Sequence, residues 1–204
     1  MRKGSEIMIQ YPKGLKRKQA PLNSTSKTID YSRRGMRLET MINEANEYYL
    51  SRGRAVIHKK PTPVRIAKVD YPKRSAAKIT EAYFTEASTT DYNGVYSGYY
   101  VDFEAKETKN KTSFPLKNFH QHQINHMKAC AQQGGLCFAI LWFSTLEKGY
   151  LLPFDILESY WNNQATGRKS IPLSIIEEDG YPCTVGLFPS IDYLSALEAW
   201  LHNE

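Results

Sequence analysis

The sequence predicts an α/β fold of α+β type, in which a central mixed β-sheet is flanked by helices. Segments with helical periodicity and segments with strand periodicity follow one another in the order helix, strands, helix, strands and helices. Apolar residues make up 41% of the 204 residues, which is enough for one domain with a hydrophobic core. No run of 18 apolar residues occurs, so we expect neither a membrane-spanning helix nor a membrane partner.

Charge is distributed unevenly along the chain. Residues 1–37 carry ten Lys/Arg and two acids, residues 51–80 carry nine and one, and residues 139–204 carry three and nine. This pattern indicates one side that faces a polyanion and another that faces solvent, although a purely solubilising pattern is the alternative. Residues 1–31 are basic, contain Pro and Gly and offer little to a core, so they are expected to form a flexible N-terminal arm before a domain at 32–204.

The three cysteines, Cys130, Cys137 and Cys183, form no C-x-x-C pair. An odd and sparse set indicates reduced thiols, which are expected to serve as small buried residues in a cytoplasmic protein. The N-terminus is basic but lacks the apolar stretch of a secretory signal.

The first elements are a helix, a strand and a long projection. Apolar residues at helical spacing predict a helix over 34–51, and residues 55–58 predict a short strand that ends before Pro61. The next segment, residues 64–86, is too long for a routine connection and combines basic and aromatic residues. We therefore expect a projection from the domain, because long insertions in compact domains are often functional.

The remaining elements are predicted from periodicity and turn signals. A strand is expected over 88–91, followed by turns at Asn93-Gly94 and Ser97-Gly98 and a second strand over 99–106, because Asn-Gly between strand-like runs is typical of a hairpin. Further expected elements are a helix over 115–132, strands over 136–143 and 149–152, and helices over 154–161 and 192–202.

The strand over 99–106 carries the motif that indicates chemistry. Its alternation places Asp102, Glu104 and Lys106 on one face, opposite an apolar face. Asp91 is expected across the hairpin, so two carboxylates and a lysine come together. Hard oxygen ligands suit Mg²⁺, which lowers the pKa of an attacking water, while a lysine offsets developing negative charge. Without context, three charged residues on a strand are usually a solvated face.

Longer blocks around this motif resemble the PD-(D/E)xK nuclease superfamily and, more closely, the RecU-type Holliday junction resolvases of Gram-positive bacteria. The resemblance covers about residues 30–195. Its blocks include Arg34-Gly35-Met36, Ile57-His58-Lys59-Lys60-Pro61-Thr62-Pro63, Val69-Asp70-Tyr71-Pro72-Lys73-Arg74-Ser75-Ala76, Ala87-Ser88-Thr89-Thr90-Asp91-Tyr92-Asn93-Gly94, Asp102-Phe103-Glu104-Ala105-Lys106 and Asn118-Phe119-His120. One departure is Thr90, which stands where the superfamily motif has proline.

The resemblance implies a nuclease domain with a restriction-endonuclease-like core and a stalk inserted at about 61–84. It implies a homodimer that nicks two opposed strands of a four-way junction in recombination and repair, with Mg²⁺ (or Mn²⁺) as cofactor and with recombinase and branch-migration proteins as further partners. Asp91 and Glu104 would bind the metal with support from Thr89 and Gln123, and Lys106 would stabilise charge. The residues expected to contact DNA are Arg34, Arg37, Lys59, Lys60, Lys68, Tyr71, Lys73 and Arg74.

Several alternatives stay open at the level of sequence. Glu39 is either a further carboxylate of the metal site or an ordinary exposed helix residue. His122 and His126 are spaced i, i+4 and suit a metal, but no H-E-x-x-H motif or nearby cysteine pair accompanies them, so DNA contact or packing is favoured over zinc. A general duplex nuclease and a non-catalytic DNA-binding regulator of a strand-exchange recombinase remain the alternative functions.

Overall fold

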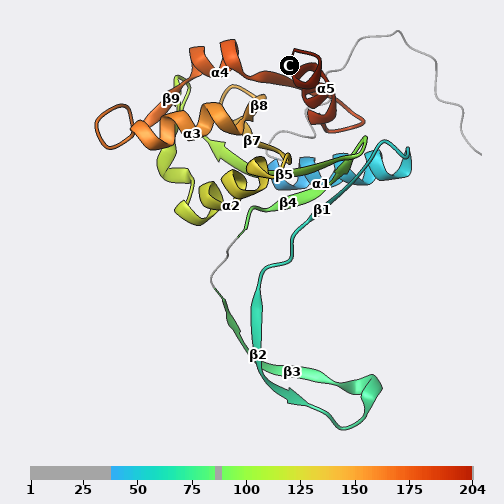
Figure 1. Cartoon of the computed structure of the whole chain (residues 1–204). Coiled ribbons are helices and arrows are strands. Elements are labelled where there is room, and N and C mark those ends of the chain that lie inside the picture. Colours follow the sequence, from blue (N-terminus) through green and yellow to red (C-terminus); the bar gives the residue numbers. More distant parts are fainter. Residues whose placement is uncertain (1–37, 86–88, 204) are drawn as a thin grey trace, which may run out of the picture. The chain divides into compact units, whose positions relative to one another are not determined.

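A seven-stranded sheet forms the centre of the structure (Figure 1). The computed structural model describes residues 38–85 and 89–203, without the side chain of Arg74. The strands of this sheet follow one another in space as β1 (Ala55–Lys59), β4 (Tyr92–Tyr96), β5 (Tyr99–Thr108), β7 (Leu136–Phe143), β8 (Lys148–Pro153), β10 (Tyr181–Val185) and β11 (Ile191–Asp192). The pairing of β5 with β7 is parallel and the others are antiparallel, which confirms the predicted mixed sheet.

Helices cover both faces of this sheet. Helices α1 (Leu38–Ser51) and α5 (Tyr193–Asn203) share one hydrophobic cluster with alternate residues of β7, including Phe138 and Ile140. The residues between them, including Ala139 and Leu141, share a second cluster with helices on the other side. These helices are α2 (Gln121–Gln132), α3 (Phe154–Asn163) and α4 (Leu173–Asp179). The predicted arrangement of a sheet flanked by helices is therefore confirmed.

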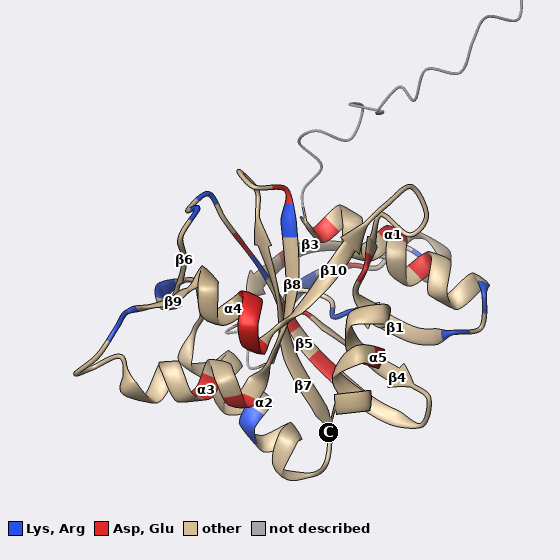
Figure 2. Cartoon of the chain, turned by 90° about the horizontal axis from the view of Figure 1, so that it is seen from above, with Lys and Arg blue, Asp and Glu red and all other residues tan. Residues whose placement is uncertain are grey.

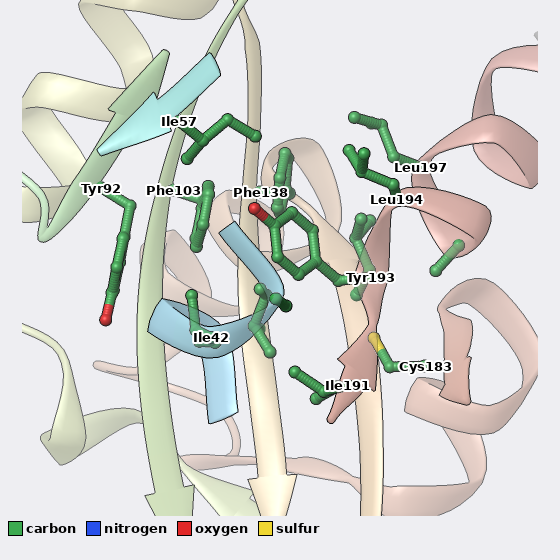
Figure 3. Close-up of a cluster of buried hydrophobic side chains, with 14 of the residues drawn as sticks. Ile42, Ile57, Tyr92, Phe103, Phe138, Cys183, Ile191, Tyr193, Leu194 and Leu197 are labelled. Atoms are coloured by element: carbon green, nitrogen blue, oxygen red, sulfur yellow. The ribbon is translucent and has the colours of Figure 1, made fainter. Parts of the chain in front are cut away.

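Aromatic rings in the first cluster fix the middle of the sheet (Figure 3). Phe103 of β5 stacks on Tyr92 of β4 and on Phe138 of β7, with ring centroids 4.9 and 4.8 Å apart. All three side chains are buried, as is Tyr193 at the start of α5. Because the odd-numbered residues of β5 anchor this cluster, the even-numbered residues from 102 to 106 must face the side of α2.

The predicted projection is a β-hairpin between β1 and β4. Strands β2 (Val64–Asp70) and β3 (Lys78–Phe84) form a two-stranded sheet of their own, joined through a short 3₁₀ turn, η2 (Arg74–Ala76). Every residue of both strands is exposed, so neither face of the hairpin packs on a core. Figure 1 shows the hairpin apart from the seven-stranded sheet. The predicted arm, residues 1–31, lies outside the described residues.

Two predictions for the first hairpin of the sheet were wrong. Thr89 to Asp91 adopt no regular structure, and the strand begins at Tyr92 instead. Asn93 and Gly94 lie inside β4 rather than in a turn, because Gly94 is where β1 comes closest. A Cβ at Gly94 would stand 2.0 Å from the carbonyl oxygen of Val56. The turn is at Ser97-Gly98, the second predicted site, where both residues have positive φ as a tight hairpin requires.

Other boundaries differ towards the C-terminus. The helix expected over 115–132 begins only at Gln121, after β6 (Ser113–Pro115) and a short 3₁₀ turn, η3 (Leu116–Asn118). The sequence predicted no element between 162 and 191, where the structure has β9 (Ser170–Pro172), which pairs with β6, as well as α4 and β10. The acidic end of α4, residues 177–179, is exposed and visible in Figure 2. None of the helices in the described part of the chain has the length and apolar content needed to cross a membrane.

Candidate active site

The charged face of β5 is buried rather than solvated. Asp102 and Glu104 are both fully buried, and the side chain of Lys106 is only 19% exposed. The ammonium of Lys106 lies 2.8 Å from Glu104 Oε1. Burying a carboxylate is costly unless something compensates its charge, so this face is not the ordinary solvated strand face that the three-residue motif alone suggested.

Asp91 lies beside Glu104 because of the register of β4 and β5. Tyr92 pairs with Phe103, which places the residue before β4 next to the residue after Phe103. The backbone N–H of Asp91 donates a hydrogen bond to Glu104 Oε2 at 3.2 Å. The structure thus brings together the three residues on which the sequence-based hypothesis rests, Asp91, Glu104 and Lys106.

The electrostatics of Glu104 suit the binding of a cation. Burial, reinforced by the nearby Asp91, raises the pKa of Glu104 to about 8 although Lys106 opposes the shift. Oε1 of Glu104 is buried, and its partner is the Lys106 ammonium at 2.8 Å. The Lys106 ammonium therefore compensates this buried carboxylate only in part, and a divalent ion would add the positive charge that burial calls for. The carboxylate oxygens of Asp91 and Glu104 fit Mg²⁺, which prefers hard oxygen ligands.

Thr89 and Gln123, the two residues expected to support the metal site, form hydrogen bonds with other partners. Gln123 is buried in the first turn of α2, where its Oε1 accepts a hydrogen bond from the backbone N–H of His120 at 2.9 Å. The hydroxyl of Thr89 donates to the carbonyl oxygen of Thr90 at 3.3 Å. Neither side chain forms a hydrogen bond with Asp91 or Glu104 among the described residues, so their role at a metal stays a prediction.

Glu39 shares a surface pocket with Asp91. The pocket lies between α1, the start of β4 and the far end of β5, and its lining also includes Tyr92 and Glu107. The Glu39 carboxylate is exposed and forms an ion pair with Lys59 at 2.6 Å. Glu39 is therefore close enough to Asp91 to face the same ligand, while its present partner is a basic residue expected to contact DNA.

A buried charge network centred on Asp102 was not foreseen from the sequence. Asp102 Oδ2 is 2.8 Å from Lys60 Nζ, 2.7 Å from the Tyr100 hydroxyl and 3.2 Å from His126 Nε2. Its Oδ1 accepts a short hydrogen bond from Thr90. Burial pushes the pKa of Asp102 upward, but the hydrogen bonds from Lys60, Thr90 and Tyr100 outweigh it and hold the pKa below the usual value.

The same network contains a set of atoms with the spacing of metal ligands. Asp102, His126 and Cys130 bring one ligand atom each within 4.8 Å of one another. The Lys60 ammonium, however, lies 2.8 Å from the Asp102 carboxylate and 3.4 Å from His126 Nε2. It supplies positive charge where a metal would, so we interpret the set as a compensated polar network. His120 and His122 are elsewhere and stack on each other at 5.6 Å.

Comparison with known proteins identifies the family. The family model described as "RecU: Recombination protein U" matches residues 33–199. The chain belongs to the RecU family. A relative from Geobacillus kaustophilus, named Holliday junction resolvase RecU, is 59% identical over 94% of this chain and 97% of its own length. A relative of the same name from Latilactobacillus sakei is 61% identical over 85% of this chain and 83% of its own.

The structural comparison adds a more distant likeness. The solved structure of Archaeoglobus fulgidus Hjc, a Holliday junction resolvase from an archaeal hyperthermophile, matches with a TM-score of 0.41 and 10% sequence identity. The match covers 69% of this chain and 92% of that one.

The residues expected to contact DNA in this RecU family member fall into two places. Lys68, Tyr71 and Lys73 are exposed on the β2–β3 hairpin, with Tyr71 64% exposed. Lys59 is exposed at the end of β1, whereas the neighbouring Lys60 is turned into the Asp102 network and only 17% exposed. Arg34 and Arg37, and the side chain of Arg74, lie outside the described residues.

Proposed function

We propose that this RecU family member is a Mg²⁺-dependent endonuclease that resolves four-way (Holliday) DNA junctions by paired nicks. The observation that carries the proposal is the buried Glu104 carboxylate, whose Oε2 accepts a hydrogen bond from the Asp91 backbone N–H and whose Oε1 lies 2.8 Å from the Lys106 ammonium. The names of the relatives, Holliday junction resolvase RecU, support the choice of substrate.

The chemistry assigned to the site is phosphodiester hydrolysis. A bound Mg²⁺ supplies Lewis acidity and makes a water more acidic at neutral pH. Asp91 and Glu104 would hold the ion, with Thr89 and Gln123 in support. The water oxygen bonds to phosphorus and releases a proton to solvent, while the bond from phosphorus to the leaving sugar oxygen breaks and that oxygen takes up a proton from solvent. The ammonium of Lys106, already beside Glu104, faces the negative charge that develops on the phosphate oxygens.

The β2–β3 hairpin supports a junction as substrate over a plain duplex. A four-way junction has a central opening at which four backbones converge, and a narrow exposed projection with Lys68 and Lys73 suits that opening. Arg74, at the turn of the hairpin, is proposed as the main phosphate contact because a guanidinium binds phosphate through two parallel hydrogen bonds.

The direct test is cleavage of a synthetic four-way junction, a matched duplex and a single strand, with and without Mg²⁺. We expect paired nicks in the junction only, lost without Mg²⁺ and slowed with Ca²⁺, whose looser coordination geometry suits binding better than catalysis. Equal cutting of duplex and junction would instead support a general nuclease. Junction binding without cleavage under any divalent ion would support the non-catalytic regulator.

We also propose a homodimer in the cytoplasm. Two symmetry-related strands are cut, so two equivalent active sites in one closed assembly fit the task. The three cysteines are free, as expected in a reducing compartment. Sedimentation should give twice the 23.4 kDa chain mass at micromolar concentration without DNA, and a stable monomer would contradict the dimer.

A further inference from the structure

Asp102 neighbours Glu104, a residue of the proposed metal site. It is on the same face of β5 as Glu104, two residues earlier, and it is fully buried. All of its polar contacts come from residues of other segments except that from Tyr100. A buried carboxylate with this many donors is a rigid point to which neighbouring elements are tied.

Lys60 ties the segment that carries Asp91 to this point. Its backbone N–H donates to the Asp91 carbonyl oxygen at 2.7 Å, and its Nζ donates to the Thr90 hydroxyl at 2.9 Å and to Asp102 at 2.8 Å. Thr90 is itself buried and bonded to Asp102. Because the segment from Thr89 to Asp91 has no regular secondary structure, these bonds do what a strand ladder does elsewhere.

Helix α2 meets the same point from the other side. His126 lies 3.2 Å from Asp102 Oδ2 and one helical turn after Gln123, the expected supporting residue of the metal site. Asp102, itself on β5, thus contacts the segment before β4 and helix α2. It links the three elements that carry the proposed metal residues.

We propose that Lys60 and Asp102 are positioning residues that set the distance between the Asp91 and Glu104 carboxylates before a metal binds. This inference rests on the proposed function, and it gives Lys60 a role other than the DNA contact expected from the sequence. Residues that orient metal ligands commonly affect metal affinity strongly without touching the ion. Cleavage should therefore depend on an ion pair that contacts neither metal nor substrate.

The test compares metal binding with stability in four single variants and one double variant of the full chain. Asp102→Asn and Lys60→Met each remove one charge of the pair, and Thr90→Val removes the bridging hydroxyl while keeping its shape. Thr90→Val is the milder change should the charge variants fold poorly. Ile176→Ala, in the second hydrophobic cluster on α4, is the control that lowers stability away from the site. The measurements are Mn²⁺ binding by calorimetry, the Mg²⁺ concentration for half-maximal cleavage, junction affinity in Ca²⁺ and the melting temperature.

The network variants should bind Mn²⁺ about 10- to 100-fold more weakly and need correspondingly more Mg²⁺, while junction affinity is unchanged. Ile176→Ala should melt earlier yet bind metal like the wild type. Asp102→Asn and Lys60→Met combined should lose less than the sum of the single losses, because the pair acts as one unit. Unchanged metal binding in Thr90→Val and in either charge variant would overturn the inference. If the wild type itself neither binds Mn²⁺ nor cuts the junction, the proposed function fails instead.

Discussion

The β2–β3 hairpin and the α2-facing side of β5 use charged residues in opposite ways. On the hairpin, residues 64–84 carry five basic and two acidic residues, and both strands are exposed on both faces. On β5 the acids Asp102 and Glu104 are buried against ammonium groups. The exposed charges of the hairpin destabilise the folded state little. The buried carboxylates of β5 would destabilise it strongly without the ammonium groups beside them.

This difference suggests that binding and chemistry are separable in the molecule. A two-stranded hairpin without a core is marginally stable in water, so the hairpin is expected to become better ordered on its substrate. The site on β5 instead depends on the packed sheet, because stacked aromatic rings fix β4, β5 and β7. Substitutions on the hairpin should therefore change affinity, and substitutions on β5 should change the chemistry.

The largest expected effect is the loss of cleavage in Glu104→Gln. Removing the charge that holds the metal should lower the cleavage rate at saturating junction by on the order of 1,000-fold or more. Junction affinity in Ca²⁺ should remain, since the hairpin is untouched. Single-turnover cleavage and gel-shift titration measure the two quantities. Cleavage at the wild-type rate in Mg²⁺ would remove Glu104 from the active site.

The converse experiment replaces residues 65–83 with a short Gly-Ser turn. Junction affinity should fall on the order of 100-fold, and the slope of log affinity against log salt should flatten by about 0.9 for each phosphate that is no longer neutralised. The melting temperature should hardly change, because the replaced strands bury nothing against the sheet. An equal loss of affinity for a matched duplex would make the hairpin a generic phosphate binder rather than a junction-specific one.

The alternation of side chains and the turn signals explain how far the sequence predicted strands β4 and β5. The period of two along 99–106 predicted which residues of β5 share a face, and the structure has Phe103 in the apolar cluster and Glu104 opposite. Asn93-Gly94 was a misleading signal because the same dipeptide also serves inside a strand. At Gly94 the backbone of β1 leaves no room for a Cβ, and no local signal reports such a close approach.

The Asp102 network was missed for a similar reason. Its members Lys60, Thr90 and His126 are separated by 30 to 66 positions, so only the fold brings them together. The alternation did place Asp102 beside Glu104, and this was the one available signal. The segment from 162 to 191 was unassigned because its strands are short and depend on neighbours such as β6 and β8 for pairing.

A third prediction concerns the stability of the metal-free protein as pH rises. The pKa of Glu104 is raised to about 8, above its ordinary value of 4.5, so the folded state holds a proton that the unfolded state releases between these values. The stability from this proton is complete below 4.5 and is lost as pH rises through 8. Glu104→Gln should therefore be more stable than the wild type at pH 9 in EDTA, by up to about 5 kcal/mol.

Denaturant unfolding at pH 5 and pH 9 measures this difference, which should nearly vanish at pH 5. Adding Mg²⁺ at pH 9 should stabilise the wild type more than the variant, since the variant keeps the Asp91 carboxylate but lacks that of Glu104. The stability difference between the wild type and Glu104→Gln could instead be the same at pH 5 and pH 9 in EDTA. That result would show that the Lys106 ammonium alone compensates the buried charge. The pH dependence of stability would then give no support to a cation at Glu104.

The smallest expected effect tests the boundary between the two regions at Lys59, which lies on β1 beside the base of the hairpin. Its ion pair with Glu39 is exposed, so Lys59→Met should change the free energy of unfolding by less than about 1 kcal/mol. If Lys59 exchanges Glu39 for a phosphate on binding, the salt slope of junction affinity should fall by about 0.9. Lys148→Met, which removes the similarly exposed pair with Glu177, is the matched control and should leave the slope unchanged. An unchanged slope in Lys59→Met would remove Lys59 from the DNA contacts and leave it as a partner of Glu39 alone.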